Sequence, residues 1–492
     1  MTIRPAKIRT ALSELSRLVS ASCVGDVDVF GISHDSRDIQ SGDLYVALAG
    51  ANTHGAEFIE QAIANGAVAV ASDAHGISIA QQFDLPTIEL TNPRIDMAHL
   101  AAQIYGHPET KLSITGVTGT NGKTTTTHML RSIFLDSGNH VGVIGTLGTY
   151  LDEECIPGAR TTPESNDLYA LLAVMVERGI THVFMEVSSH ALALHRVVGL
   201  KFDVAIFTNL TQDHLDFHGS MENYFAAKAR LFTPEYARSS VICTDDNWGQ
   251  ELLTNVRIPA ISVGSSGDWI TTKATSNASG MTVQNLKLPN GDSINLQVNM
   301  LGTYNATNAA CALIASELLG NPLAASLKSL EHIRAIPGRL EKVEISSAGT
   351  AIIDYAHTPD AVATVLTVIR DSNPQKIITV IGCGGDRDTQ KRPMMGKIAS
   401  QLSDVVIVTD DNPRSENPSE IRSAVLTGTV EGSAQIQEIG NRREAIALAL
   451  RMARDGDVIA VLGKGHETGQ EIAGEVFPFD DRLVVAQESA NV

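Results

Sequence analysis

The stretch 112–129 reads LSITGVTGTNGKTTTTHM and decides the fold of the chain. It begins with a short apolar run typical of a buried strand. It continues through three glycines to Lys123 and Thr124, and then enters a helical pattern of apolar residues. Glycines let backbone N–H groups turn inward onto phosphate oxygens, and the amino end of a helix adds partial positive charge. The stretch therefore predicts a phosphate-binding loop between a strand and a helix.

The residue types in this loop suit a nucleotide. Lys123 can reach terminal phosphates, and the Thr124 hydroxyl can hold Mg²⁺. The spacing is a variant of the standard motif, because Val117 stands where that motif has its first glycine, and Gly116 lies one residue too early. The alternative is a glycine-rich turn that binds nothing. It is disfavoured because Gly-Lys-Thr follows a strand and opens a helix, as the motif requires.

Composition limits the classes of protein that fit. A chain of 492 residues with 43% hydrophobic content predicts about two to four domains with well-packed cores. A net charge of −19 argues against a nucleic-acid or anionic-membrane partner. The five cysteines show no CxxC spacing, the first residues lack the apolar core expected of a signal peptide, and no apolar run is long enough to span a bilayer. We therefore expect a cytoplasmic protein with reduced thiols, and a monomer.

Three segments follow from the alternation of strand-like and helical patterns. Residues 1–108 read as a small N-terminal α/β domain, which ends near the punctuation Gly-His-Pro at 106–108. Residues 109–335 read as a central P-loop-like ATPase domain with a mostly parallel sheet. Residues 336–492 read as a C-terminal Rossmann-like, doubly wound α/β domain. A hinge-like Pro-Gly-Arg at 337–339 connects the last two segments.

Polar residues end two predicted strands of the central segment. Glu186 ends one, and Asp213, His214 and Asp216 follow the next. Carboxyl ends of parallel strands meet at one sheet edge, so Glu186 and His214 are candidate Mg²⁺ ligands. The alternative for Glu186 is a cap on the following helix. By pattern alone Lys228 is a solvated helix lysine. The asparagines at 305 and 308 precede an apolar helix expected at 309–319, and they either cap it or reach a nucleotide.

Loops after the C-terminal strands bring charged residues to one edge of the predicted sheet. They place Arg387, Asn412, Arg414 and Glu467 there. Arginine forks fit carboxylates, and a glutamate fits an ammonium group, so this edge suits a zwitterionic amino acid. The alternative is a set of surface salt bridges.

Several of these motifs together resemble the Mur ligases, which add amino acids to the peptidoglycan precursor. The matching stretches are TGTNGKTT at 118–125, EVSSH at 186–190, TNL at 208–210 with DHLD at 213–216, and DYAHTP at 354–359. They occur in the family's order over essentially the whole chain. The DNPR stretch at 411–414 is similar to that of the members that add meso-2,6-diaminopimelate.

The resemblance implies an ATP- and Mg²⁺-dependent ligase that adds meso-2,6-diaminopimelate to UDP-N-acetylmuramoyl-L-alanyl-D-glutamate through an acyl phosphate. It implies four catalytic residues, Lys123, Glu186, His214 and Lys228, of which Lys228 is carbamylated. The implied metal ligands are Thr124, Glu186, His214 and Lys228. The implied ATP-binding residues are Gly119, Thr120, Asn121, Gly122, Lys123, Thr124, Thr125, Asn305, Arg339 and Asp354.

The resemblance also assigns the other two substrates. The implied UDP-substrate residues are Ser36, Ala51, Asn52, Thr53, Thr161, Thr162, Ser188 and Arg196. The implied diaminopimelate residues are Arg387, Asp411, Asn412, Pro413, Arg414, Gly463 and Glu467. By the same resemblance, residues 1–108 bind the UDP substrate, 109–335 bind ATP, and 336–492 bind the amino acid.

Departures and alternatives remain open at this stage. Arg160 stands where some relatives have asparagine, and Leu194 stands where some have glutamine. The stretch 51–53 also differs from the better-known sequences of the family. The same reaction with L-lysine and a folylpolyglutamate synthetase-like ligase are alternative enzymes. A switch or scaffold that binds ATP without ligating is an alternative of another class.

Overall fold

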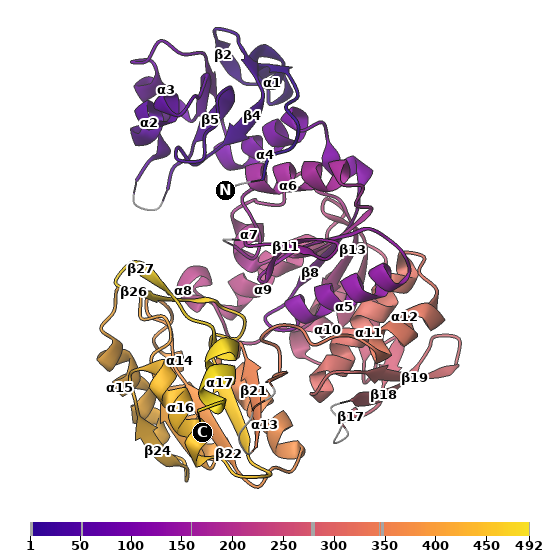
Figure 1. Cartoon of the computed structure of the whole chain (residues 1–492). Coiled ribbons are helices and arrows are strands. Elements are labelled where there is room, and N and C mark those ends of the chain that lie inside the picture. Colours follow the sequence, from indigo (N-terminus) through magenta and orange to yellow (C-terminus); the bar gives the residue numbers. More distant parts are fainter. Residues whose placement is uncertain are drawn as a thin grey trace.

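The computed structural model describes residues 3–50, 53–158, 160–276, 281–343, 345 and 349–491. It contains three α/β domains, which follow one another along the chain from top to bottom in Figure 1. Each domain is built on its own mainly parallel sheet. The α/β class predicted from the sequence is confirmed.

The N-terminal domain is built on a five-stranded sheet of order β2-β7-β6-β5-β4. Strands β4 to β7 run parallel, and β2 is antiparallel to β7. A two-stranded ribbon of β1 and β3 lies beside it. The elements are β1 (Thr10–Ala11), α1 (Leu12–Leu18), β2 (Ser22–Val24), β3 (Asp28–Val29), β4 (Gly31–Ser33), β5 (Asp43–Ala47), η1 (Gly55–Phe58), α2 (Ile59–Ala64), β6 (Ala69–Ser72), α3 (Ala74–Ala80), β7 (Thr87–Glu89) and α4 (Pro93–Ile104).

The central domain contains the largest sheet. Its parallel part has the order β9-β12-β8-β13-β14-β15-β16, with β8 in the middle. Antiparallel strands extend it at both edges, β10 and β11 on one side and β17 to β19 on the other. Because β12 and β13 both flank β8, the loops that follow these three strands open at one edge of the sheet.

The strands of this domain are β8 (Ser113–Thr118), β9 (Val141–Gly145), β10 (Gly148–Leu151), β11 (Glu154–Ile156), β12 (His182–Glu186), β13 (Phe202–Phe207), β14 (Ala237–Cys243), β15 (Ala260–Gly264), β16 (Trp269–Thr271), β17 (Thr275–Ser276), β18 (Thr282–Lys287) and β19 (Ser293–Val298). The helices are η2 (Pro108–Lys111), α5 (Lys123–Asp136), α6 (Ser165–Glu177), α7 (Ser189–Ala193), α8 (Leu215–His218), α9 (Met221–Ala229), η3 (Arg230–Phe232), α10 (Asn247–Asn255), α11 (Thr303–Leu318) and α12 (Leu323–Glu331). The sequence pattern placed the start of α11 too late, because it counted only the apolar run and not the polar first turn.

The C-terminal domain has a six-stranded sheet of order β20-β21-β25-β22-β23-β24, parallel except for β20. A separate hairpin of β26 and β27 follows it. The elements are β20 (Glu341–Val343), β21 (Thr350–Asp354), α13 (Pro359–Asp371), β22 (Ile377–Ile381), α14 (Lys391–Leu402), β23 (Val405–Val408), α15 (Pro418–Thr429), β24 (Gln435–Glu438), α16 (Arg442–Met452), β25 (Val458–Leu462), β26 (Gly469–Ile472), β27 (Glu475–Pro478) and α17 (Asp481–Ser489).

Apolar packing accounts for the parallel strands. Strands β9, β22 and β25 are buried along their whole length, as expected when helices cover both faces of a parallel sheet. Helices α5 and α11 bury Met129, Leu130 and Ala309 in one cluster with Val117 of β8. A second cluster runs without interruption from α4 of the N-terminal domain to α6 of the central domain. Burial of this kind is worth about 25 cal/mol per Å² of apolar surface and joins these two domains.

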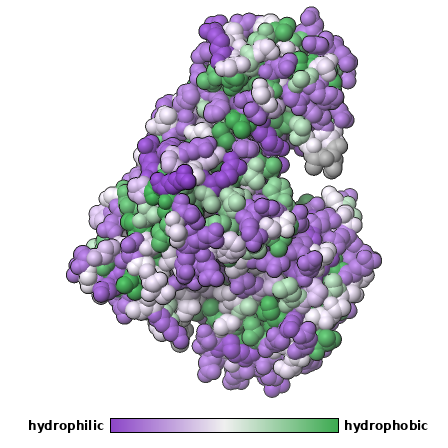
Figure 2. Space-filling model, turned by 180° about the vertical axis from the view of Figure 1, so that it is seen from behind, coloured by the Kyte–Doolittle hydropathy of each residue, from purple (hydrophilic) through white to green (hydrophobic). Residues whose placement is uncertain are grey.

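The surface shows hydrophobic residues dispersed among polar ones, and it is hollowed on one side between the N-terminal domain and the rest (Figure 2). Among the helices that the structure describes, none combines the length and the apolar character needed to cross a membrane.

Candidate active site

The phosphate loop joins β8 to α5. Gly122, the residue before α5, has φ of 88°, and no side chain caps the helix, so its first N–H groups are left for a ligand. Gly119 has φ of 152°, and a Cβ there would collide with Thr208. A Cβ on Gly122 would collide with the Asn308 side chain. Both positions therefore require glycine, because neighbouring segments of the same chain come too close for a side chain.

Lys123 folds back over the loop. Its Nζ atom donates hydrogen bonds to the carbonyl oxygens of Gly119 at 2.9 Å and Thr120 at 2.8 Å. Burial lowers the pKa of Lys123, and the carboxylates of Glu186 and Asp213 oppose that shift. An anion that entered the loop would replace these carbonyl partners with a stronger, charge-assisted one.

Glu186 faces the phosphate loop from the end of β12. Its Oε1 atom accepts hydrogen bonds from Thr124 Oγ1 at 2.9 Å and from the Thr146 backbone N–H at 2.8 Å. Its Oε2 atom accepts one from Thr146 Oγ1 at 3.1 Å. The alternative that Glu186 caps the next helix is wrong, because Ser188 caps α7. A hydroxyl and a carboxylate oxygen in contact form a donor set that suits Mg²⁺.

His214 lies beside this group, after β13. It has φ of 55° and precedes α8. Its ring packs edge-on against His190 at a centroid distance of 4.7 Å, and Nε2 lies 3.4 Å from Asp213 Oδ2. Burial lowers the pKa of His214 to about 4, against the opposing charge of Asp213. Near pH 7 the ring is therefore neutral, which is the form that can ligate a metal.

Lys228 is buried, although the helix pattern alone predicted a solvated side chain. It is 1% exposed, and its Nζ atom donates a 2.8 Å hydrogen bond to the Gly119 carbonyl. The same atom lies 4.6 Å from the centre of the Tyr224 ring. Burial and the nearby Lys123 charge hold the pKa of Lys228 well below its usual range. The interpretation as a solvated lysine is wrong, because α9 packs this side against the phosphate loop.

Asn305 and Asn308 both lie within α11, so neither is its cap. Asn305 Nδ2 donates to the Leu301 carbonyl at 2.7 Å. Asn308 Nδ2 donates to Asn305 Oδ1 at 3.1 Å, and Asn308 is the residue that packs against Gly122. Sequence reasoning gave Asn308 the same two alternatives as Asn305, a helix cap or a nucleotide contact, and did not predict its contact with Gly122. Its spacing of one helical turn after Asn305 was the available signal.

Arg339 and Asp354 come from the start of the C-terminal domain. Arg339 Nη2 donates a 3.0 Å hydrogen bond to Thr124 Oγ1, and the guanidinium lies over the Tyr355 ring at 4.9 Å. The Asp354 carboxylate accepts backbone N–H groups of Leu340 at 2.7 Å and Ala356 at 2.8 Å. Arg339 thus reaches the phosphate loop, whereas both oxygens of Asp354 are held within their own domain.

Four predicted UDP-substrate residues gather on the other side of Glu186. Thr162 Oγ1 donates to the Glu186 carbonyl at 2.8 Å and lies 3.3 Å from Ser188 Oγ. Arg196 Nη1 donates to the Thr162 carbonyl at 3.2 Å, and Thr161 Oγ1 lies 3.1 Å from Thr146 Oγ1. These side chains continue the site from the phosphate loop towards the N-terminal domain.

The other predicted UDP-substrate residues belong to the N-terminal domain. Ser36 Oγ donates to Gln61 Oε1 at 2.7 Å. The Thr53 carbonyl accepts the Gly50 N–H at 3.1 Å. Their contacts place them apart from the central cluster. Ala51 and Asn52 lie outside the described residues.

Glu164 holds three arginines between the N-terminal and central domains. Its carboxylate lies 3.2 Å from Arg94 of α4, 2.7 Å from Arg160 and 2.8 Å from Arg196. Arg160 therefore has a structural partner where relatives can have asparagine. Leu194, the other departure, follows the last residue of α7 and adds no polar group.

The C-terminal loops form a second polar cluster. Asn412 Nδ2 donates to Glu467 Oε2 at 2.8 Å. The fully buried Lys464 donates to Asn412 Oδ1 at 3.0 Å and to Glu467 Oε2 at 2.9 Å. Asp411 Oδ1 accepts the Asn412 N–H at 2.7 Å, and a Cβ on Gly463 would approach Asp411 Oδ2 within 2.5 Å. Lys464 therefore fixes two predicted amino-acid-binding residues at once, and sequence reasoning did not single it out.

Arg414 and Arg387 both approach Gly384. A Cβ on Gly384 would come within 2.9 Å of Arg414 Nη1 and 4.0 Å of Arg387 Cγ. Arg414 Nη1 donates to the Gly385 carbonyl at 2.7 Å, and Arg387 Nη1 donates to the Asp386 carbonyl at 3.2 Å. Each guanidinium has further N–H groups beyond this backbone contact. Pro413 lies in the same loop, and its carbonyl packs against Gly385.

Comparison with known proteins identifies the family of the chain. Three family models match in order: "Mur ligase family, catalytic domain" at 28–105, "Mur ligase middle domain" at 117–316 and "Mur ligase, glutamate ligase domain" at 338–465. A curated relative from Streptomyces avermitilis, named UDP-N-acetylmuramoyl-L-alanyl-D-glutamate–2,6-diaminopimelate ligase, is 42% identical, over 98% of this chain and 97% of its own length. The chain belongs to the Mur ligase family.

Solved structures of other ligases resemble this Mur ligase in fold. A structure of a UDP-N-acetylmuramoyl-L-alanyl-D-glutamate–2,6-diaminopimelate ligase superposes with a TM-score of 0.67 at 30% identity, covering 98% of this chain and 99% of that one. A Mycobacterium tuberculosis folylpolyglutamate synthase complexed with ADP has a TM-score of 0.64 at 18% identity, over 75% of this chain and 91% of its own. The second likeness shows a shared fold only.

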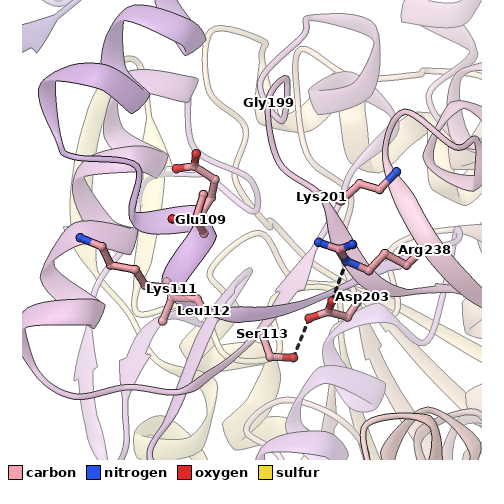
Figure 3. A pocket seen from close by; sticks show the side chains of 9 residues that line it. Glu109, Lys111, Leu112, Ser113, Gly199, Lys201, Asp203 and Arg238 are labelled. Carbon is pink, nitrogen blue, oxygen red and sulfur yellow. Dashed lines mark hydrogen bonds and ion pairs between the residues drawn. The ribbon is translucent and has the colours of Figure 1, made fainter.

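One cavity of this Mur ligase lies away from the site. Figure 3 shows it at the amino ends of β8 and β13, whereas the phosphate loop follows the carboxyl end of β8. Asp203 in its wall accepts hydrogen bonds or ion pairs from Ser113 at 2.8 Å and Arg238 at 3.0 Å. Three of its polar lining residues are thus paired with one another.

The metal-binding prediction for this Mur ligase depends on few protein groups. Within the described residues, no three His, Cys, Asp or Glu side chains gather closely enough to hold a metal ion. Mg²⁺ commonly takes one or two carboxylates and completes its shell with water and substrate phosphates. The contact between Thr124 and Glu186 fits such a site.

Proposed function

We propose that this Mur ligase joins meso-2,6-diaminopimelate to the D-glutamate of UDP-N-acetylmuramoyl-L-alanyl-D-glutamate and converts ATP to ADP and phosphate. The choice of diaminopimelate as the substrate rests on one observation, the grouping of Asn412, Arg414 and Glu467 at one edge of the C-terminal sheet. Two arginines and a glutamate suit a ligand with carboxylate and ammonium groups. The names of the full-length relatives support the same substrate.

We divide the substrates among three segments. Residues 1–108 take the UDP end of the acceptor, residues 109–335 take ATP, and residues 336–492 take the amino acid. The continuous contacts from Thr162 through Glu186 to Thr124 support this order, because they link the acceptor side to the phosphate loop. We further propose that the enzyme works as a monomer in the cytoplasm.

We assign ATP and Mg²⁺ to the phosphate loop. The residues from Gly119 to Thr125 would bind the phosphates, with Lys123 on the terminal one, and Asn305, Arg339 and Asp354 would serve the rest of the nucleotide. Thr124 and Glu186 would hold one Mg²⁺, and His214 would help to hold a second. Bound Mg²⁺ would neutralise charge on the phosphoryl oxygens. Lys123 would exchange its carbonyl partners for the terminal phosphate and add a fixed positive charge.

Lys228 fits the carbamylated lysine of this family. Carbamylation requires a neutral amine, and burial with the neighbouring Lys123 holds the pKa of Lys228 well below its usual range. The product would carry negative charge beside Lys123 and His214. That charge would relieve the repulsion between the two lysines and supply a carboxylate-like ligand for Mg²⁺.

The chain's residues would then order the reaction. The acceptor carboxylate, placed by Thr162, Ser188 and Arg196, would attack the terminal phosphate of ATP in line, and ADP would leave as the acyl phosphate forms. The amine of diaminopimelate would attack the acyl carbon, and phosphate would leave. Water would hydrolyse the acyl phosphate, so contact between the domains must exclude it. The hydrogen bond from Arg339 to Thr124 supports such contact at this point.

Specificity would come from charge complementarity at Arg414. Diaminopimelate differs from lysine by a distal carboxylate, which Arg414 would bind. With lysine, the guanidinium would face an ammonium group where the pocket is built for a carboxylate. A site built for a polar group rejects an analogue that lacks it by about 10⁴-fold or more.

A phosphate-release assay tests the proposal. Release should require ATP, the UDP-dipeptide and diaminopimelate together, and lysine or glutamate should replace diaminopimelate poorly. Phosphate release with lysine, and not with diaminopimelate, as the added amino acid would favour the lysine-adding reaction. Release with glutamate and a folate would favour a folylpolyglutamate synthetase-like ligase. ATP binding without release under any of these conditions would favour the scaffold.

A further inference from the structure

A carboxylate of this chain already pairs with Arg414. Nε of Arg414 lies 3.2 Å from Oε2 of Glu471, a residue of β26. The Arg414 side chain is 21% exposed and that of Glu471 is 40% exposed. The pair is therefore partly dehydrated and still open to solvent, as expected for the rim of a binding pocket.

The backbone of the hairpin fixes Glu471 beside this loop independently of its carboxylate. Arg414 N–H donates to the Glu471 carbonyl at 3.0 Å, and Ala473 N–H donates to the Arg414 carbonyl at 2.8 Å. The Glu471 N–H donates to Asn412 Oδ1 at 3.0 Å. Removing the charge of Glu471 therefore leaves the main-chain contacts between the hairpin and the loop intact.

Arg414 has capacity for a second carboxylate. The guanidinium has five N–H donors, of which Nε faces Glu471 and Nη1 donates to the Gly385 carbonyl. Within the described part of the chain, no acceptor lies on Nη2. A carboxylate binds a guanidinium best across two nitrogens. A substrate carboxylate on Nη2 would therefore lie next to the Glu471 carboxylate on the same planar group.

We propose that Glu471 sets the affinity and selectivity of the amino-acid pocket by sharing Arg414 with the distal carboxylate of the substrate. The inference rests on the proposed function, in which Arg414 receives that carboxylate. Glu471 repels the distal carboxylate of diaminopimelate and attracts the terminal ammonium of lysine. It therefore raises the KM for diaminopimelate and narrows the preference for diaminopimelate over lysine.

The test is the steady-state KM of Glu471→Gln for diaminopimelate, measured by phosphate release. Glutamine keeps the size of the side chain and removes the charge. The matched control is Glu475→Gln, which removes the same charge from β27 of the same hairpin, at the position paired with Ile472. We expect Glu471→Gln to lower the KM for diaminopimelate by about two- to fivefold, because partly exposed charges interact weakly. The kcat, the KM for ATP and the KM for the UDP-dipeptide should not change.

Lysine supplies the second arm of the test. In Glu471→Gln, kcat/KM for lysine should fall or stay constant while kcat/KM for diaminopimelate rises, so that their ratio increases. A KM for diaminopimelate that is unchanged, raised, or lowered equally in Glu475→Gln would overturn the proposal. A wild-type enzyme without diaminopimelate-dependent release would instead refute the proposed function, and an Arg414→Ala variant with an unchanged KM would refute the pocket.

Discussion

Arg339 Nη2 donates a hydrogen bond of 3.0 Å to Thr124 Oγ1. Thr124 belongs to the phosphate loop of the central domain, and Arg339 precedes β20 of the C-terminal domain. A second bridge joins Asn121 Nδ2 to Asp360 Oδ2 at 3.2 Å. The C-terminal domain therefore contacts the residues that would hold the nucleotide.

Replacing Arg339 tests this contact. We expect Arg339→Ala to lower kcat/KM for ATP by about 10²-fold, the usual scale for losing one charged donor to a developing charge. The steady-state rate of phosphate release at varied ATP measures it. The control is Arg334→Ala, because Arg334 is exposed on the same connection. Equal kinetics in the two variants would separate Arg339 from the nucleotide.

Replacing Arg414 tests the amino-acid pocket. Arg414→Ala should lower kcat/KM for diaminopimelate by about 10²- to 10³-fold, because the distal carboxylate loses its charged partner. Binding of ATP, measured by calorimetry, should remain as in the wild type. Arg451→Ala, at an exposed position on α16, is the control. Unchanged kinetics for diaminopimelate would remove Arg414 from the pocket.

Replacing Glu186 tests the proposed metal site. Glu186→Gln keeps an acceptor for Thr124 and Thr146 but removes the charge. We expect a higher Mg²⁺ requirement and a fall in kcat of about 10²-fold or more, since a metal ligand is lost. Titration of the rate with MgCl₂ measures both effects. Glu251→Gln, exposed on α10, should leave the titration unchanged. A wild-type Mg²⁺ curve for Glu186→Gln would contradict the assignment.

Carbamylation of Lys228 can be measured directly. Native mass spectrometry of the wild type in bicarbonate buffer should show the added mass of one CO₂, and Lys228→Met should lack it. The variant should lose most of its activity while it keeps its melting temperature within a few degrees. Lys328→Met, at an exposed lysine of α12, should retain both activity and adduct. An active Lys228→Met enzyme would rule out a role for the carbamate.

The pH dependence of stability should reflect His128. Burial lowers the pKa of His128 from 6.5 to about 3, so the folded protein keeps the ring neutral while the unfolded chain takes up a proton below pH 6.5. The free energy of unfolding therefore falls as the pH drops from 6.5 towards 3, by up to about 1.4 kcal/mol per pH unit. His128→Phe keeps a ring against Tyr150, whose centroid lies 5.1 Å away, and removes this loss.

Urea unfolding of the wild type and His128→Phe at about pH 7 and about pH 5 checks this linkage. The variant should lose about 2 kcal/mol less stability than the wild type between these conditions. His99→Phe, at an exposed position of α4, should behave as the wild type. An equal loss in all three proteins would contradict the prediction.

Much of the central site could be predicted because sheet geometry is regular. The contact between Thr124 and Glu186 follows from β8 and β12 being parallel neighbours, so that the loops after both strands meet. The burial of Lys228 could not be predicted from its helix. It arises because α9 packs against Gly119, more than a hundred residues earlier in the chain. The periodicity of a sequence shows only which face of a helix is apolar. It cannot reveal a lysine that is buried because its amine donates a hydrogen bond to a distant backbone carbonyl.

The C-terminal pocket shows the same limit. The sequence predicted that Asn412, Arg414 and Glu467 would share an edge, and the structure brings Asn412 to Glu467 at 2.8 Å. It did not predict Lys464 between them or Glu471 on Arg414. Both contacts depend on where the chain turns after β25 and on the β26–β27 hairpin.

The antiparallel strands at the edges of the central sheet were also missed by sequence reasoning, because the alternation of apolar and polar residues in them is short.

The hydrogen bonds and ion pairs of Arg414 come from Gly385, Glu471 and Ala473, all in the C-terminal domain. The hydrogen bonds of Lys123 go to Gly119 and Thr120 of the central domain. The residues proposed to choose the amino acid and those proposed to bind the phosphates therefore lie on separate stretches of the chain. Grafting the loops at 384–388, 411–416 and 463–478 from one ligase onto another should exchange the accepted amino acid and leave the energy-coupling machinery of the host untouched, so the scaffold lends itself to modular redesign.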